Sequence, residues 1–294
     1  MLRMVLGVSA NIPRHLAIFR LMRSPAYAQF LGTNPRLPFR CLIRDYLANS
    51  LSSRERAASF LHHYKRLKAG LSTELLDSML FRRVTVLESQ QNGIHCEISL
   101  CFSRPFEKEG ELSLNLHVDG AIVFVLSFTI VPGWVIQSDS KDVFLISRLQ
   151  GMRDYYPQIR AATKALSDVA PSALLLAALD GFGKFLGIRR FASVSAVRQS
   201  SYTEELSPFY KNAYDDFFSE IGLSSNASGF FVSPLPPEEK PMAFIKHGHK
   251  LRTREKRQFK REVADQVCIR LRQGLPRETL EPCSEIESVQ TVDA

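Results

Sequence analysis

The sequence lacks paired cysteines, a recognisable secretory leader and a hydrophobic run long enough to cross a membrane. Its 294 residues contain five cysteines, and none of them forms a Cys-x-x-Cys pair. An odd number of scattered cysteines argues against a disulfide framework and indicates a reducing compartment, so we expect a cytoplasmic protein. The apolar run at the start of the chain is too short for a leader with a cleavage site. The longest uncharged window, residues 120–138, contains Pro132 and Gly133, which suits two strands and a turn better than a spanning helix.

Several motifs that indicate a known chemistry are also missing. There is no P-loop, no nucleophile elbow and no dinucleotide-binding fingerprint. His62 and His63 are neighbours in a predicted helix, so they cannot both face one metal ion. His247 and His249 have no cysteine or carboxylate near them at a metal-ligand spacing. We therefore expect no metal site.

Acidic residues are almost absent from the first fifty positions, where Asp45 is the only one. Seven arginines share this region: Arg3, Arg14, Arg20, Arg23, Arg36, Arg40 and Arg44. Apolar residues recur at helical spacing between Pro13 and Leu31, which predicts a basic amphipathic helix. Such a helix can bind anionic phospholipid headgroups or an acidic partner, although a solvated basic face gives the same pattern.

A second basic segment lies near the other end of the chain. Residues 246–272 contain ten Lys and Arg against three acids, and the whole chain carries a formal charge of +8. Phe259 is the only aromatic residue in this segment. Single-stranded nucleic acid usually stacks on several aromatic side chains, so we do not expect nucleic-acid binding.

The hydrophobic period changes from helical to alternating in the middle of the chain. Leu112, Leu114 and Leu116 alternate with polar residues, and a second alternating run follows Asp119-Gly120. Asp-Gly between two alternating runs is a strong hairpin signal. Further strands are predicted at residues 84–89, 94–102, 143–147, 191–196 and 230–232, and helices at 13–31, 39–48, 53–67, 157–166, 171–186, 210–221 and 252–271. The predicted fold is α+β, with a mainly antiparallel sheet of about five to seven strands flanked by helices.

Four ordered blocks of the sequence carry a family resemblance. They are Ile146–Gly151, Ile159–Lys164, Leu174–Gly187 and Tyr214–Gly222. Together with Phe60–Tyr64 and the basic helix near the C-terminus, these blocks resemble the bacterial VirK/YbjX family over residues 54–271. The resemblance implies a role in virulence or cell-envelope maintenance rather than a defined reaction. With the charge pattern, it divides the chain into a basic helical region at residues 1–50, a VirK/YbjX-like core at 51–272 and an acidic tail at 273–294. We expect the tail to be disordered because of its composition.

Two positions depart from the family pattern. Residues 165–172 keep a proline but lack the His and the second Lys that relatives carry in this segment. Phe218 stands where relatives have Trp, which keeps the aromatic volume and loses an N–H donor. A role that relatives assign to that His or Lys therefore does not transfer to this chain.

Arg148, Gln150 and Gly151 are predicted at the junction of a strand and a helix. Sheets with helices on their faces commonly bind ligands at such junctions through backbone amides and helix N-termini. The order of hairpin, strand, Gln-Gly, helix and strand is similar to the acyl-CoA pyrophosphate site of the GCN5-related acyltransferase fold, although the full glycine signature is absent. On this interpretation the three residues and Lys164 would hold the phosphates of acyl-CoA. The alternative is that Gly151 is a plain turn residue.

Asp215 is the candidate catalytic residue, as a general base or substrate anchor. No second carboxylate or histidine is visibly tied to it, and a carboxylate favoured by the helix dipole would look the same. Two hypotheses therefore stand. One is a cytoplasmic accessory factor at the inner membrane, bound to anionic lipid or an envelope protein. The other is an acyl-CoA-dependent, acyltransferase-like enzyme.

Overall fold

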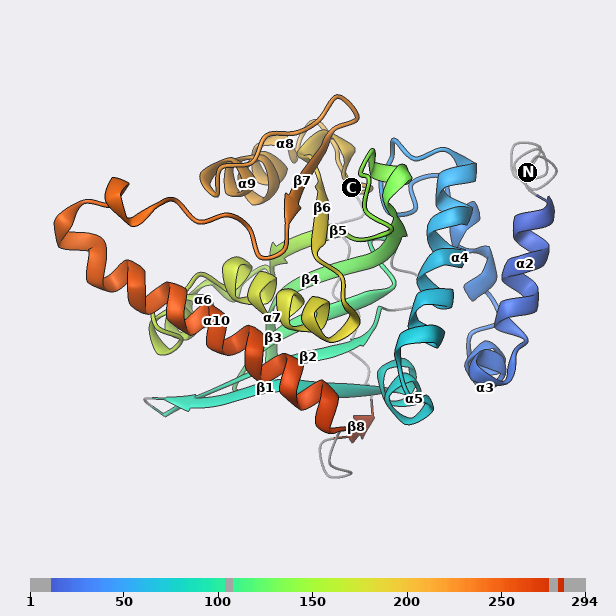
Figure 1. The fold of residues 1–294 in the computed structure, drawn as a ribbon, viewed down its shortest axis with the longest axis horizontal. Coiled ribbons are helices and arrows are strands. Elements are labelled where there is room, and N and C mark those ends of the chain that lie inside the picture. Colours follow the sequence, from blue (N-terminus) through green and yellow to red (C-terminus); the bar gives the residue numbers. More distant parts are fainter. Residues whose placement is uncertain (1–11, 92, 104–107, 275–279, 283–294) are drawn as a thin grey trace.

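A single mixed sheet organises the part of the chain that the computed structural model describes, which is residues 12–91, 93–103, 108–274 and 280–282. Its eight strands lie in the order β7-β6-β5-β4-β3-β2-β1-β8 (Figure 1). The bounds are β1 Arg82–Gln91, β2 Ile94–Phe102, β3 Leu112–Val118, β4 Ala121–Pro132, β5 Asp142–Gly151, β6 Arg190–Val194, β7 Phe230–Pro234 and β8 Leu280–Pro282. All neighbours are antiparallel except β5 and β6. The predicted α+β fold with a mainly antiparallel sheet is confirmed.

Helices gather on one face and at one end of this sheet. Their bounds are α2 Ile12–Met22, α3 Pro25–Thr33, α4 Ser53–Gly70, α5 Thr73–Phe81, α6 Tyr156–Ala165, α7 Pro171–Leu186, α8 Ser207–Tyr210, α9 Phe217–Glu220 and α10 Lys250–Gln273. Helices α6, α7 and α10 cross one face, whereas α2 to α5 lie together beside the sheet (Figure 1). None of the described helices is long and apolar enough to span a membrane.

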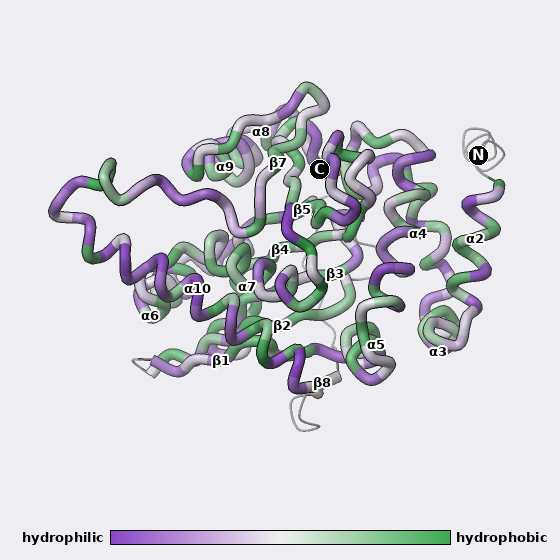
Figure 2. Tube along the Cα trace, viewed as in Figure 1, coloured by the Kyte–Doolittle hydropathy of each residue, from purple (hydrophilic) through white to green (hydrophobic). Residues whose placement is uncertain are grey.

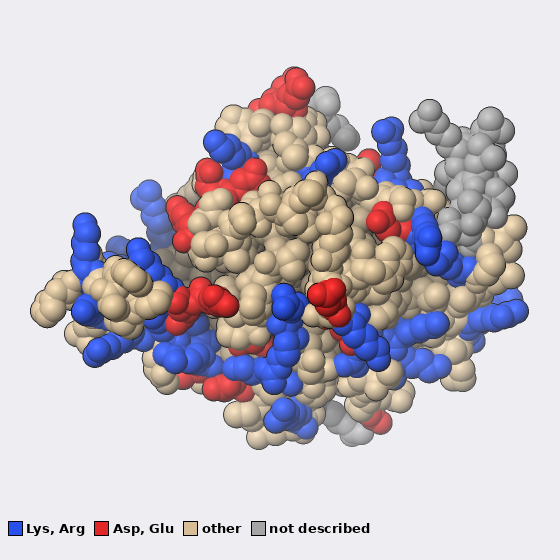
Figure 3. All heavy atoms as spheres, turned by 45° about the horizontal axis from the view of Figure 1, so that its top comes forward, with Lys and Arg blue, Asp and Glu red and all other residues tan. Residues whose placement is uncertain are grey.

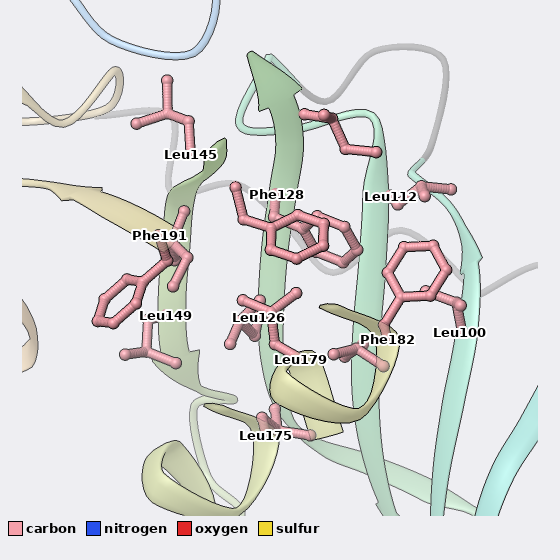
Figure 4. Close-up of a cluster of buried hydrophobic side chains, with 14 of the residues drawn as sticks. Leu100, Leu112, Leu126, Phe128, Leu145, Leu149, Leu175, Leu179, Phe182 and Phe191 are labelled. Atoms are coloured by element: carbon pink, nitrogen blue, oxygen red, sulfur yellow. The ribbon is translucent and has the colours of Figure 1, made fainter. Parts of the chain in front are cut away.

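The Asp119-Gly120 turn joins β3 and β4 as the sequence predicts. Both residues adopt positive φ, 49° and 86°, which is what a tight hairpin turn requires. The register of this hairpin places the leucines of β3 and Leu126 and Phe128 of β4 on the face that α7 covers. Figure 4 shows Phe128 and Leu126 beside Leu179 and Phe182 of α7. The ring of Phe182 lies 5.9 Å from that of Phe128, which is within the range of favourable aromatic pairs.

Helix α10 packs closely on α7 because Gly181 has no side chain. A Cβ atom at this position would lie 2.5 Å from the carbonyl oxygen of Ala264, so any larger residue would push the two helices apart. The rest of α10 is mostly hydrophilic, in contrast to the strands in the middle of the sheet (Figure 2). Only a narrow stripe of α10 is therefore buried, at Val263, Ala264, Val267, Cys268 and Leu271.

The N-terminal helices differ from the prediction and are part of the main core. The expected helix over residues 13–31 is two helices, because Pro25 cannot continue a helix and starts α3 instead. The expected helix over 39–48 is a short 3₁₀ turn, η1 Leu37–Leu42, followed by Leu47 at φ 68°. Tyr27 packs edge-on against Tyr64 with ring centroids 5.3 Å apart, which joins α3 to α4.

The predicted helix over residues 210–221 is also broken up. It consists of α8, a π-helical turn, η4 Lys211–Asp216, and α9. A π-turn inserts one extra residue per turn and rotates the side chains that follow it, and such turns occur often at functional positions. Here the turn directs Tyr214 into the protein, where it is completely buried. Of the predicted tail, residues 275–279 and 283–294 lie outside the described part.

Candidate functional site at the junction of strands β5 and β6

Strands β5 and β6 separate soon after they begin to pair. Their parallel pairing covers only Phe144 to Ile146 on β5. Directly after this point β5 contains a bulge at Ser147. Ser127 and Phe128 are consecutive on β4, but their partners on β5, Arg148 and Ile146, are two residues apart, so Ser147 is the extra residue. A bulge bends a strand and increases its local twist. The bulge therefore marks the place where β5 turns away from β6 while it continues along β4 to Gly151.

Two side chains fill the space that opens between the strands. The hydroxyl of Tyr214 accepts a hydrogen bond from the backbone N–H of Leu149 at 3.2 Å. Gln199 donates from Nε2 to the carbonyl oxygen of Ser147 and to the Tyr214 hydroxyl, the latter at 2.9 Å. Both side chains are buried, and burial raises the pKa of Tyr214. The free backbone groups at the edge of β5, the Leu149 N–H and the Ser147 carbonyl, are thus hydrogen-bonded to side chains. The junction is filled rather than an open cleft.

Arg148 and Gln150 lie side by side on the face of β5 opposite α7. With the Gln150 amide oriented so that its oxygen faces Arg148, that oxygen accepts a hydrogen bond from Nε of Arg148 at 3.0 Å. Nε of Arg148 also lies 3.6 Å from the carboxylate of Glu109. Glu109 in turn accepts a hydrogen bond from the hydroxyl of Ser201 at 3.0 Å. The guanidinium is therefore held by an acid of the chain itself, in a mostly buried position.

Gly151 and Lys164 do not join this pair. Gly151 pairs with Phe124 on the face that α6 covers, and a Cβ atom there would lie 3.0 Å from Cδ1 of Ile159. Its φ is not in the left-handed region. Lys164 is exposed on α6, beyond that face. The four predicted anion ligands are thus divided between opposite sides of the sheet.

Asp215 makes a structural hydrogen bond. One of its carboxylate oxygens accepts a hydrogen bond from the backbone N–H of Ala196 at 2.8 Å. This N–H begins the 3₁₀ turn η3 Ala196–Arg198. A carboxylate suits this position because a backbone N–H at the start of a helical turn has no partner within the turn. Asp215 therefore ties the π-turn to the segment that follows β6.

The face that carries Arg148 is polar and yet buried, which the sequence pattern alone did not reveal. Its buried polar residues on β1 to β4 are Thr85, Glu97, Ser99, Ser113, Asn115, His117, Ser127 and Thr129. The hydroxyl of Ser113 lies 2.7 Å from that of Ser103 and 2.8 Å from that of Ser127. A sheet face that contacts solvent usually carries charged side chains such as Lys and Glu. The Ser, Thr and Asn residues at the polar positions of these strands were therefore the signal in the sequence that this face is buried. Buried polar groups need hydrogen-bond partners, and these side chains find theirs in one another, so the face is an internal polar network.

A second buried polar cluster surrounds Glu111. Its carboxylate accepts hydrogen bonds from Arg40 at 3.0 Å, from Tyr46 at 2.6 Å and from Tyr64 at 2.6 Å. Glu111 and Arg40 are almost fully buried. Burial and the charge of Glu111 raise the pKa values of both tyrosines. The cluster connects the N-terminal segment to the sheet.

Metal chemistry has no visible basis in the described residues, which contain no group of three His, Cys, Asp or Glu side chains placed to hold an ion. His63 is buried and accepts a hydrogen bond at Nδ1 from the backbone N–H of Ile130 at 3.0 Å. His62 instead lies 2.7 Å from Asp142. The two neighbouring histidines thus contact different strands, His63 contacting β4 and His62 contacting β5.

Comparison with known proteins places the chain in a family. No curated protein and no solved structure shows a significant match to the chain. One family model matches residues 9–268, which is most of the chain. The chain therefore belongs to the family described as a protein of unknown function, DUF535, which is the family of VirK/YbjX proteins.

Proposed function

We propose that this DUF535 protein is an accessory factor for bacterial virulence or cell-envelope maintenance that acts at an anionic membrane surface. The observation that carries the proposal is a surface on α2 and η1 where exposed apolar side chains lie among arginines. We call it the α2–η1 surface, and its apolar members are Ile12, Leu16, Phe39 and Ile43. The cytoplasmic face of the inner membrane would be its site of action.

The geometry of α2 supports this role. His15, Ile18 and Met22 are buried and hold α2 against the protein. Ile12 and Leu16 point the other way and are 49% and 50% exposed. The two segments form one surface, because the ring of Phe19 on α2 packs edge-on against Phe39 of η1 at 5.5 Å.

The charges around this surface match an anionic bilayer. Four exposed arginines flank it: Arg20, Arg23, Arg36 and Arg44. None of the four has an ion pair with an acid in the described part of the chain. Figure 3 shows Lys and Arg both on the side of the N-terminal helices and along α10. Each basic residue near an anionic leaflet contributes about 1 kcal/mol, and inserted apolar side chains add to this.

Vesicle flotation tests the proposal. The full chain should float with phosphatidylglycerol vesicles, not with phosphatidylcholine vesicles, and less in high salt because charges are screened over ~8 Å at physiological ionic strength. Leu16→Glu should abolish flotation and Arg20→Glu with Arg23→Glu should weaken it. Phe244→Glu is the matched control, because Phe244 is 69% exposed but lies just before α10. Equal flotation with both lipids, or none with either, would contradict a membrane-surface role.

An acyl-CoA-dependent enzyme is the second candidate. It is favoured by the separation of β5 and β6 after the Ser147 bulge, next to a buried polar face that carries Arg148 and Gln150. The filling of that separation by Tyr214 and Gln199 favours the accessory factor. Calorimetry with a set of acyl-CoA esters decides between them. Absence of heat with all of them would remove the enzyme hypothesis.

A further inference from the structure

A large groove lies between helices α7, α9 and α10 and the proline-rich connector that follows β7. Its volume is about 1010 Å³, in the range of sites that bind drug-sized or lipid-sized molecules. Apolar side chains line much of it, including Leu176 and Ala177 of α7, Phe217 of α9, and Ile221, Leu223 and Pro237. None of these residues belongs to the α2–η1 surface or to the β5–β6 junction.

The groove continues into a smaller cavity at the start of α7. This cavity has a volume of about 270 Å³ and shares Ala173, Arg257 and Lys260 with the groove. Half-buried Ala173 therefore stands where the two spaces meet. The combined site is an open groove with apolar side chains in its larger part and a smaller end at the start of α7.

That end is cationic. Lys256, Arg257 and Lys260 of α10 line the smaller cavity together with a single acid, Asp168. Asp168 already forms an ion pair with Arg252, with 2.8 Å between its carboxylate oxygen and the guanidinium. Burial and the nearby charge of Arg252 lower the pKa of Lys256, which is the sign of cations held close together.

The connector shows what this end can bind. The carboxylate of Glu239 lies 3.1 Å from Arg257 and 2.8 Å from Lys260, so one anionic group already bridges two of the cations. Lys256 remains beside them without an ion pair to a described acid. The first turn of α7 faces the same cavity, and its N-cap, Ala170, offers no side-chain acceptor to the free N–H groups. An additional anion would meet complementary charge here.

We propose that the groove is a binding site for a single-chain phospholipid, with the acyl chain between α7, α9 and the connector and the phosphate at Lys256 and Lys260. The larger part of the groove is lined by apolar side chains and by charges of both signs, including Asp180, Glu220, Glu238 and Glu239. Its smaller end has one acid, Asp168, beside Lys256, Arg257 and Lys260. This arrangement fits an amphipathic anion whose phosphate lies at the smaller end. The proposal stands on residues of α7, α9 and α10 and is independent of the membrane surface on α2.

Fluorescence with a labelled lysophosphatidic acid, below the concentration at which it forms micelles, tests the site on the full chain. The labelled lipid should bind, and Ala173→Trp, which blocks the passage between the two cavities, should weaken binding at least about tenfold. Lys256→Glu should have an effect of similar size. Arg254→Glu is the matched control, because Arg254 is exposed on the same helix and lines neither cavity. Circular dichroism and thermal unfolding verify that each variant is folded.

Competition with unlabelled compounds identifies the ligand class. Lysophosphatidic acid should displace the label, whereas monoacylglycerol, which lacks the phosphate, and glycerol 3-phosphate, which lacks the chain, should do so at least about tenfold less well. The proposal is overturned if the label does not bind or if the Trp and Glu variants bind like the wild type. Stronger displacement by palmitoyl-CoA would also overturn it in favour of an acyl thioester site. Leu16→Glu should leave this binding intact, so failure here is distinct from failure of vesicle flotation.

Discussion

The hydroxyl of Tyr214 accepts a hydrogen bond from the backbone N–H of Leu149 at 3.2 Å. In a longer β5–β6 pairing a backbone carbonyl of β6 would accept such a bond, but β6 pairs with β5 only as far as Ile146. Gln199 donates to the same hydroxyl. Together with the bond from Gln199 to the Ser147 carbonyl, this hydroxyl supplies the hydrogen bonds that β6 no longer gives to the edge of β5. This relationship makes Tyr214, the first residue of the sequence block Tyr214–Gly222, a structural element of the sheet.

Tyr214→Phe should destabilise the protein by about 1–3 kcal/mol, because it leaves the Leu149 N–H and the Gln199 amide without their shared acceptor in a buried place. Urea unfolding of wild type and variant measures the difference. Tyr156→Phe is the control, since Tyr156 is 65% exposed, and it should change the free energy of unfolding by less than about 0.5 kcal/mol. Equal stability of Tyr214→Phe and wild type would show that the edge of β5 finds another partner.

Glu111→Gln should be more damaging, by about 3–5 kcal/mol, because it leaves the buried guanidinium of Arg40 without its counter-charge. The same unfolding measurement applies. Glu88→Gln removes the carboxylate of a solvent-exposed pair with His95 at 2.8 Å and should have little effect. If Glu111→Gln and Glu88→Gln lower the free energy of unfolding by the same amount, burial does not determine how much the Arg40–Glu111 pair contributes to stability.

Local signals predicted strands β1 to β7 and helices α4, α6, α7 and α10, whereas α5 was not predicted. Ser52 and Glu55 form the capping box that starts α4, and Gly187 ends α7 in the left-handed conformation. Strand β2 has the predicted bounds. These features depend on residues close in sequence, so a single chain reveals them. Pro25 is also a local signal, and it separates α2 from α3 where the helical period alone predicts one helix over residues 13–31.

The candidate site depends on contacts that sequence spacing does not encode. Strand alternation already places Arg148 and Gly151, three residues apart, on opposite sides of the sheet. The bulge at Ser147, which shifts both relative to the first half of β5, is not visible in the spacing. Asp215 lies in the π-turn after α8 and accepts a hydrogen bond from Ala196, 19 residues earlier in the chain. The partners of Glu111 come from positions 40, 46 and 64, far from it in the chain. No periodicity argument could have joined them.

His63 should make stability depend on pH. Burial lowers the pKa of His63 from 6.5 to about 3 in the folded protein, where its Nδ1 must stay unprotonated to accept the Ile130 N–H. The unfolded chain therefore takes up a proton at this residue between pH 6.5 and about pH 3 while the folded chain does not. Its contribution to stability is complete above pH 6.5 and is lost as the pH falls.

The test compares the free energy of unfolding near pH 7.5 and pH 5.5. His63→Asn keeps an acceptor without the titration, so the fall on acidification should be smaller than in wild type by about 1.4 kcal/mol. His95→Asn, at an exposed histidine, should fall as the wild type does. Identical pH dependence in wild type and His63→Asn would mean that His63 is not the buried neutral group.

Gly151→Ala should destabilise the protein through contact with Ile159 rather than through backbone strain. The new methyl group would lie 3.0 Å from Cδ1 of Ile159, and the φ of Gly151 suits any residue. Overpacking of this kind costs about 1–3 kcal/mol. Ile159→Val removes the Cδ1 atom, so the same glycine substitution should cost less in that background.

A double-mutant cycle measures this coupling, which we expect to be at least about 0.5 kcal/mol. Gln150→Ala serves as the neighbouring control, because Gln150 faces the other side of the sheet and should show no coupling to Ile159. Additive effects of Gly151→Ala and Ile159→Val would show that Ile159 moves aside freely. The close packing of α6 on the end of β5 would then not be the reason for a glycine at position 151.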